Sequence, residues 1–336
     1  MHIVRPPVTK EEIRVLVYTV RRILYSIPVL IATTFITFWA VVKAGNPVEQ
    51  LKVNPRIDPH TIHLLIVQDH LNRSIPVQYW FWLKNVFTHH FGYYLIGQQP
   101  IWPDITRTLG HTLQVVGLSL VIAFVLGVSI GIYSAVRQYS VFDYFFTTFS
   151  FLGFAMPTFL LALLLQIGAT DIFTHWNVRI FYTSGLNSPG QNGYWTLDRM
   201  QHIVLPVVTL TIISLAVYSR YMRASMLDVL NTDYVRTARA KGLAEWRVVM
   251  GHVFRNALIP MATVLALDIG AIFGGAIITE SIFQLDGIGS WFLRELAVPD
   301  VYGVMAYLLI TATMIILFNL IADIAYGFLD PRIRLD

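Results

Sequence analysis

The chain has 336 residues, of which 55% are hydrophobic and 13% charged, with a formal net charge of +4. A soluble domain of this size would expose far more charge. The apolar residues come in blocks of about 20 or more, the length that a helix needs to cross a bilayer core about 30 Å thick. Cysteine is absent, which excludes disulfides, thiolate metal sites and cysteine nucleophiles.

We predict an all-α, polytopic membrane protein with six transmembrane helices. In chain order, the apolar blocks are residues 23–42, 113–135, 142–170, 202–218, 260–282 and 301–328. Barrel strands would alternate polar and apolar residues, and these blocks do not. The first block is too long for the apolar region of a secretory signal, so we expect it to be retained as a helix.

These helices divide the chain into five parts. We expect a cytoplasmic segment 1–22, a first helix 23–43, an external cap 44–110, a core of five helices 111–330 and a cytoplasmic C-terminus 331–336. The core contains one long cytoplasmic loop, residues 219–259.

Basic residues give the orientation. With a cytoplasmic N-terminus, 15 of the 24 Lys and Arg face the cytoplasm, and the loop 219–259 supplies seven of them. The excess of Lys and Arg in cytoplasmic loops favours this orientation, with both termini inside. These loops account for the basic pI, so the charge is no argument for binding nucleic acid.

The external cap is broken into short pieces by six prolines. Its stretch 78–94 is dense in aromatic residues, which is typical of a segment at the membrane interface; a docking surface is the alternative. The adjacent His89 and His90 point to different faces of a helix or strand, so we expect no metal site there.

Two features bear on helix packing. Met156-Pro157 lies near the middle of the third predicted span, where a proline would kink the helix. Two pairs of glycines are four residues apart, Gly127 with Gly131 and Gly270 with Gly274, a spacing that lets helices approach closely.

The cytoplasmic loop contains a short polar stretch that predicts a helix over residues 231–242. Asn231 or Thr232 can cap its first turn, Asp233 suits its positive end, and Gly242 suits a left-handed stop. A helical spacing places four residues on one face, which we expect to meet a partner protein: Tyr234, Thr237, Ala238 and Lys241. The alternative is a solvated loop that carries positive charge.

The surrounding motifs resemble the coupling loop of ABC-importer permeases. That family has Glu-Ala-Ala, three residues, a Gly and a later Leu-x-Pro; this chain has Arg236-Thr237-Ala238, then Gly242 and Leu258-Ile259-Pro260. The Arg in place of Glu and the longer spacing to Pro are similar to the peptide-importer branch, as are "DYVRTARAKG" and "HVFRNALIP". Further matches are "VFDY", "TESIF", "GIG" and "YGFLDPRIR". One departure is Asp286, where relatives often have Pro.

The resemblance implies the B-type permease of a dipeptide or oligopeptide importer, with a type I permease fold, in the inner membrane of a prokaryote. It implies a homologous second permease, two ATP-binding subunits, an extracytoplasmic solute-binding protein and the lipid bilayer as partners, and no cofactor, metal or catalytic residue. It places ATPase docking on Tyr234, Arg236, Thr237, Ala238, Arg239, Ala240, Lys241 and Gly242. No lysine follows a glycine, so the sequence contains no P-loop and ATP hydrolysis belongs to other subunits.

Two acids lie inside predicted spans. Asp268 should face protein or water, because a charge there costs about 2.5–3.5 kcal/mol. It is a candidate pathway residue that attracts a peptide amine, or a helix–helix hydrogen-bonding group. Asp323 is a candidate structural partner of Arg332 or Arg334.

Three functions fit these residues. The first is the pore subunit of an ATP-driven peptide importer, in a family that also contains nickel and oligosaccharide carriers. The second is an ion-coupled secondary transporter that uses Asp268 and Asp323 as proton sites. The third is a channel or scaffold without transport coupling.

Overall fold

The computed structural model describes residues 10–45, 49, 52, 58–88, 91–95, 98–191, 193–272, 276–297 and 300–329. Within these ranges the chain is helical, and its only β-type pairing is an isolated bridge between Tyr93 and Pro100. The all-α prediction is therefore confirmed. The helices fall into two units, which are described separately below.

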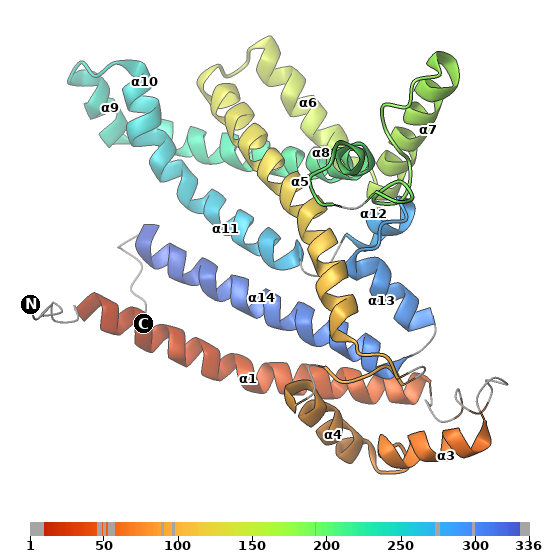
Figure 1. The fold of residues 1–336 in the computed structure, drawn as a ribbon. Helices are drawn as coiled ribbons and strands as arrows, with labels where there is room; N and C mark the ends of the chain where they lie inside the picture. Colours follow the sequence, from red (N-terminus) through yellow and green to blue (C-terminus); the bar gives the residue numbers. More distant parts are fainter. Residues whose placement is uncertain are drawn as a thin grey trace, which may run out of the picture. The chain divides into compact units, whose positions relative to one another are not determined.

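The first unit comprises residues Met1–Leu109, Trp291–Gly327 and Pro331–Asp336. Its helices are α1 (Lys10–Ala44), α3 (Pro59–Gln68), α4 (Ile75–Thr88), most of α13 (Ile288–Ala297) and α14 (Val301–Leu329), with the start of α5 (Trp102–Val136). Figure 1 shows α1 and α14 side by side. Phe38 of α1 and Met305 of α14 are buried in one cluster with Tyr79 and Trp82 of α4.

The cap helix α4 contributes to this core. Tyr79 shares a hydrogen bond of 2.8 Å with Thr34 of α1, whereas Trp80 and Phe87 remain exposed. The aromatic stretch that we predicted to lie at the membrane interface is therefore only partly available for that role, because Tyr79 and Trp82 attach the cap to α1.

The second unit comprises Gly110–Ser290 and Phe328–Asp330. Its helices are the rest of α5, α6 (Val141–Ala155), α7 (Thr158–Trp176), α8 (Leu197–Leu230), α9 (Asp233–Ala240), α10 (Glu245–Arg247), the π-helix η1 (Val248–Val253), α11 (Phe254–Ile272) and α12 (Ile277–Ile282). Helix α8 is central, because it packs against α6, α7, α11 and η1. The predicted cytoplasmic loop 219–259 is mostly helical.

Glycines hold α5 against α8. A β-carbon on Gly127 would come within 2.8 Å of the Tyr218 β-carbon, and one on Gly131 within 2.6 Å of the Met222 β-carbon. Only hydrogen atoms fit at these positions, so the first glycine pair has the packing role that its spacing predicts. The second pair reaches Gly274, which lies outside the described residues.

Five described helices are long and apolar enough to cross a membrane: 19–44, 102–136, 158–176, 197–230 and 301–321. The predicted third span is not one kinked helix. It is two helices, since Met156 adopts the extended backbone that a following proline favours and Pro157 starts α7. The predicted fifth span is likewise divided between α11 and α12. The count of six spans stays a prediction.

Candidate functional site

Helix α9 forms where the sequence predicts the short polar helix, and its end is defined by a glycine. Gly242 has φ +76°. Its N–H donates to the Arg239 carbonyl over 2.9 Å, and the Leu243 N–H donates to the Ala238 carbonyl over 3.4 Å. This pair of bonds is the Schellman arrangement, which satisfies the last carbonyls of the helix and requires the left-handed residue.

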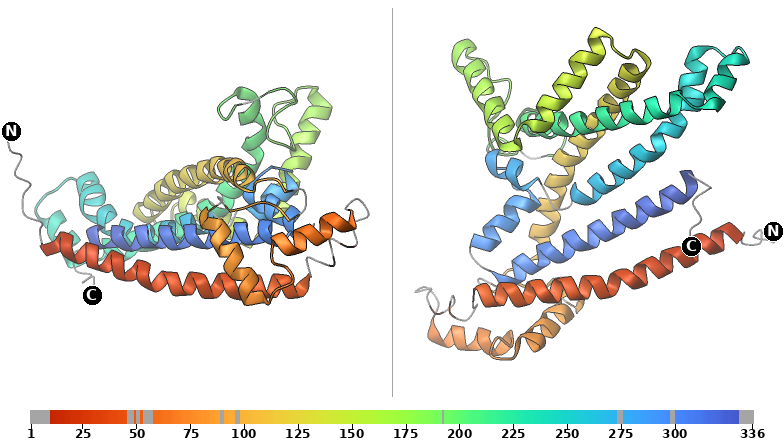
Figure 2. Two further views of the ribbon diagram at one scale, coloured as in Figure 1. Left: turned by 60° about the horizontal axis from the view of Figure 1, so that its bottom comes forward. Right: turned by 180° about the vertical axis from the view of Figure 1, so that it is seen from behind.

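The inner side of α9 is anchored in the second unit. Val235 is fully buried and Ala238 is 7% exposed, in a cluster that includes Met226 of α8, Val253 of η1 and Ala257 of α11. Figures 1 and 2 show α9 and α10 at the end of the unit where α8 and α11 meet. Helix α9 therefore shares a hydrophobic core with both α8 and α11.

One sequence prediction is corrected here. We predicted that Ala238 shares the partner-facing surface with Tyr234, Thr237 and Lys241. The structure turns Ala238 toward the chain's own core, whereas Tyr234, Thr237 and Lys241 are exposed. The small side chain of Ala238 thus permits close packing within the chain. Helical spacing alone could not distinguish the two directions, because Ala is accepted on either side.

The outer side of α9 is polar and mostly basic. Arg236, Arg239, Ala240 and Lys241 are exposed with Tyr234 and Thr237; we call these six residues the outer face. Arg239 contacts Glu245 of α10 through two hydrogen bonds of 2.7 and 3.2 Å, and this contact raises the pKa of Arg239 and lowers that of Glu245. Both partners are more than one third exposed, so the pair orders α10 against α9 rather than adding much stability.

Large exposed apolar side chains follow α9 in the chain, and the sequence analysis did not identify them. Leu243, Trp246 and Met250 are 38%, 66% and 47% exposed, and Tyr234 is 46% exposed. The guanidinium of Arg247 lies 5.4 Å from the Trp246 ring. Aromatic and Arg residues at an exposed apolar patch are typical of protein interfaces. Because the surrounding stretch is polar in composition, these exposed apolar side chains did not stand out in the sequence.

The "VFDY" motif joins α6 to α8. Asp143 is almost fully buried and accepts hydrogen bonds from Arg223 Nε at 2.7 Å and Nη2 at 2.8 Å. It also accepts from the Tyr139 N–H at 2.9 Å. A bidentate ion pair of this kind fixes the orientation of the two side chains as well as their distance. The loop before α6 is therefore held against the half of α8 that leads to α9.

Asp268, the candidate pathway residue, accepts a hydrogen bond from another helix. The Tyr218 hydroxyl on α8 donates to its Oδ2 at 2.7 Å, and Tyr218 is fully buried. The bond agrees with the helix–helix alternative that the sequence left open. The side chain of Asp323 lies outside the described residues, as do Arg332 and Arg334.

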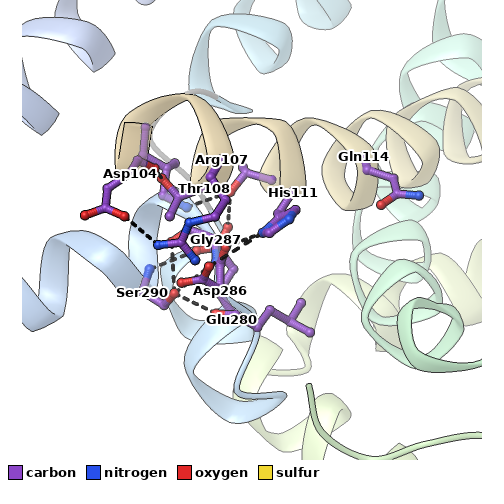
Figure 3. A network of polar contacts seen from close by, with 12 residues as sticks. Asp104, Arg107, Thr108, His111, Gln114, Glu280, Asp286, Gly287 and Ser290 are labelled. Atoms are coloured by element: carbon purple, nitrogen blue, oxygen red, sulfur yellow. Dashed lines mark hydrogen bonds and ion pairs between the residues drawn. The ribbon is translucent and has the colours of Figure 1, made fainter. Parts of the chain in front are cut away.

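The "TESIF" and "GIG" motifs form one polar network, which Figure 3 shows from close by. Glu280 is 2% exposed; it accepts from the Thr112 hydroxyl at 2.6 Å and from the Ser290 N–H at 2.9 Å. The Ile288 N–H in turn donates to Thr112 at 2.9 Å. These bonds join α12, the following turn and α5 within the second unit.

Both glycines of the turn are required by close contacts with α12. A β-carbon on Gly287 would overlap the Glu280 carboxylate, and one on Gly289 would lie 2.7 Å from Ile277 Cγ1. The main-chain carbonyl of Asp286 lies 2.8 Å from His111 Nδ1, which keeps the turn in contact with α5. Among the described residues, no cluster of His, Asp and Glu is suited to hold a metal.

Comparisons with known proteins place the chain in a family. The profile of "Binding-protein-dependent transport system inner membrane component" matches residues 127–335, and that of its N-terminal region matches residues 15–116. The oligopeptide transport system permease protein OppB of Mycobacterium tuberculosis is 36% identical over 321 residues, covering 94% of this chain and 98% of OppB.

Two further relatives cover similar lengths. The oligopeptide transport system permease protein AppB of Bacillus subtilis is 37% identical, covering 94% of this chain and 99% of AppB. The dipeptide transport system permease protein DppB of Escherichia coli is 33% identical, covering 94% and 98%. The chain therefore belongs to the family of binding-protein-dependent transport system inner membrane components, as a non-catalytic permease subunit.

Proposed function

We propose that this chain is the pore-forming subunit of an ATP-driven importer of di- or oligopeptides, and that α9 couples ATPase closure to alternating access. The observation that carries the coupling role is the two-sided character of α9: a basic outer face exposed to a partner, and an inner side buried with α8, η1 and α11. The names of the relatives support peptides as the solute class.

The proposed docking surface is the outer face of α9. Tyr234 and Thr237 supply contact area, and Arg236 and Lys241 supply charge that steers an acidic groove toward it. Ala238 and Gly242 act differently: Ala238 anchors the helix in the core and Gly242 ends it. The exposed Trp246 extends the surface onto α10.

Closure is transmitted by packing. Because Val235 and Ala238 share one cluster with residues of α8, η1 and α11, a partner that pulls the outer face moves these elements together. The π-helix η1 leads directly into α11, and such segments occur frequently at functional sites. We expect η1 to adjust when α9 moves.

The chain supplies one docking helix, so we propose that it pairs with a homologous second permease and that the two contact two ATP-binding subunits. An extracytoplasmic binding protein delivers the solute. We propose an inner membrane location with both termini in the cytoplasm. Nickel or an oligosaccharide remains the alternative solute within the family.

A reconstitution tests the function. The assembled complex in proteoliposomes should accumulate a labelled tripeptide only with ATP and loaded binding protein, and a protonophore should leave accumulation unchanged. Accumulation driven by a proton gradient without ATPases would indicate a secondary transporter. Equilibration without ATP would indicate a channel.

A pair of variants tests the docking surface. Thr237→Trp adds bulk to the outer face and should prevent the ATPases from co-purifying with the permease. Lys84→Trp, at an exposed site on α4 of the predicted external cap, is the matched control and should not. Co-purification of the ATPases at wild-type stoichiometry with Thr237→Trp would exclude this face as the docking surface.

A further inference from the structure

The first unit contains a cavity of about 210 Å³, bounded by α3, α4, the segment after α4 and the start of α14. Its lining includes Asp69, Trp82, Asn85, Phe91, Tyr93 and Tyr302. The lining thus combines one carboxylate, an amide and several aromatic rings. None of the contacts described above uses the polar side chains of this cavity.

Asp69 is held by its main chain, while one oxygen of its carboxylate is buried without a partner. Its N–H donates to the Leu65 carbonyl at 2.9 Å, at the end of α3, and its carbonyl accepts from the Tyr302 hydroxyl at 3.5 Å. The carboxylate oxygen Oδ2 is buried and has no hydrogen-bond partner. The Asp69 side chain is only partly buried, but a buried carboxylate oxygen without a donor is unfavourable, so a cation at the open side of the carboxylate would stabilise it.

Trp82 provides the complementary group. It is 2% exposed, and its ring packs against Phe38 and Tyr79. Its Nε1 is buried and, like Asp69 Oδ2, has no partner. The cavity lining therefore includes two residues with unpaired groups: Asp69, with a negatively charged acceptor, and Trp82, with a neutral donor.

These groups match one chemical fragment. A primary ammonium satisfies a carboxylate and is attracted to the faces of aromatic rings such as Phe91, Tyr93 and Tyr302. An indole N–H donates to a carbonyl. The first residue of a peptide has an ammonium and a carbonyl separated by one carbon atom. The cavity is smaller than the roughly 300–1,000 Å³ of pockets that enclose drug-sized ligands, so it fits a terminal residue and not a whole peptide.

We propose that this cavity binds a primary ammonium group, with Asp69 as its counter-charge and the Trp82 N–H as donor to the neighbouring carbonyl. As the binding site for a peptide's free amino terminus, it rests on the proposed function. A lysine side chain of a partner protein carries the same ammonium group, and the experiment separates the two sources.

The electrostatics of the cap support this assignment. Burial, and the negative charge of Asp300, raise the pKa of Asp69 to about 6. Asp69 is therefore mostly ionised at neutral pH but insufficiently stabilised, and a bound cation would relieve both effects.

The test is direct binding to the assembled transporter in nanodiscs, without ATP and without binding protein. Trialanine and N-acetyl-trialanine are the probes. Asp69→Asn keeps the size of the side chain and removes its charge. Asp58→Asn is the matched control, because Asp58 is an exposed cap of α3 that does not line the cavity and Asn is an equally good cap.

We expect wild type and Asp58→Asn to bind trialanine and not its acetylated form, and Asp69→Asn to lose trialanine affinity by about tenfold or more. Equal binding of the two peptides by wild type, or unchanged trialanine affinity in Asp69→Asn, would overturn the peptide assignment. Uptake of trialanine in proteoliposomes is measured separately, so a failure of the proposed function is distinguished from a failure of this site.

A second experiment tests whether the ammonium group comes from a lysine of a partner protein. If wild type binds neither peptide, the affinity of the binding protein for the complex is measured in the same variants. A loss of about tenfold in Asp69→Asn alone, reproduced by acetylating the lysines of the binding protein, assigns the ammonium to that protein. No loss in this arm overturns the ammonium site altogether.

Discussion

Tyr218 donates a hydrogen bond of 2.7 Å to Asp268, and this bond connects α8 to α11 within the second unit. Tyr218 is fully buried, and its β-carbon also faces Gly127 of α5. One tyrosine thus contacts three helices, and the Asp268 carboxylate, which the sequence left open between a pathway role and a helix–helix bond, makes such a bond here.

This relationship predicts the effect of two substitutions. Asp268→Asn keeps an acceptor for Tyr218, so the variant should assemble and transport at near wild-type level. Asp268→Leu leaves the buried Tyr218 hydroxyl unpaired, which costs about 1–3 kcal/mol and should lower the yield of assembled complex. Size-exclusion chromatography and tripeptide uptake check both. A selective loss of uptake of free-amino peptides in Asp268→Asn, with assembly intact, would instead support the pathway role.

The Schellman end of α9 predicts a coupling defect in Gly242→Val. No atom lies within 4 Å of an added β-carbon, so the defect comes from the backbone alone. A φ of +76° costs a β-branched residue about 1–2 kcal/mol or more. We expect normal insertion but reduced stimulation of ATP hydrolysis by loaded binding protein.

Gly168→Val is the control, since Gly168 in α7 also has open space around it, has no positive φ and lies outside the cluster that contains α9. Full stimulation in Gly242→Val would show that this stop is not needed for coupling.

Close packing of α5 on α8 predicts that Gly131→Ala destabilises the chain. The added methyl group would meet the Met222 β-carbon and the Ser219 carbonyl oxygen, at 2.6 and 2.8 Å. Forcing such a group into a packed interface costs about 1–3 kcal/mol. Thermal denaturation in detergent should show a lower midpoint. Gly117→Ala in the same helix has no atom within 4 Å and should not shift it.

The Glu280 network predicts that Gly287→Ala disrupts the turn after α12. The methyl group would occupy the place of the Glu280 carboxylate, which then loses its bonds to Thr112 and Ser290. We expect a lower thermal midpoint than in Gly168→Ala, which introduces the same methyl group into open space. Equal midpoints would mean that the turn can shift without a loss of stability.

The raised pKa of Asp69 predicts pH-dependent binding in the cap cavity. At about pH 7 the Asp69 carboxylate is mostly ionised, and at about pH 5 it is mostly protonated and cannot pair with an ammonium, since its pKa is about 6. The peptide amino group, with a pKa of about 7.7–8.0, stays charged at both. Trialanine affinity should therefore fall by about tenfold between these pH values, and weak residual binding by Asp69→Asn should not change.

Local signals made the helix α9 predictable from the sequence. Gly242 and the basic residues near the end of α9 act within one or two turns, so their pattern determines where the helix ends. The expected side-chain cap at its start does not form, because the Thr232 hydroxyl donates to the Val229 carbonyl instead. Apolar blocks of membrane length likewise specify an all-α chain, because backbone groups in lipid must be satisfied within a helix. The partners are expected from the family motifs alone, because no local pattern contains them.

The sequence by itself thus determined the helical class, the short helix α9 and its left-handed stop. Only the tertiary structure decided that Ala238 faces inward, that Met156-Pro157 separates two helices, and that Glu280 bonds to Thr112 across 168 residues. The physical reason is the separation along the chain of the residues that interact. Capping and periodicity involve neighbours in the chain, whereas the direction of a side chain and the partner of a buried carboxylate depend on which helices pack together.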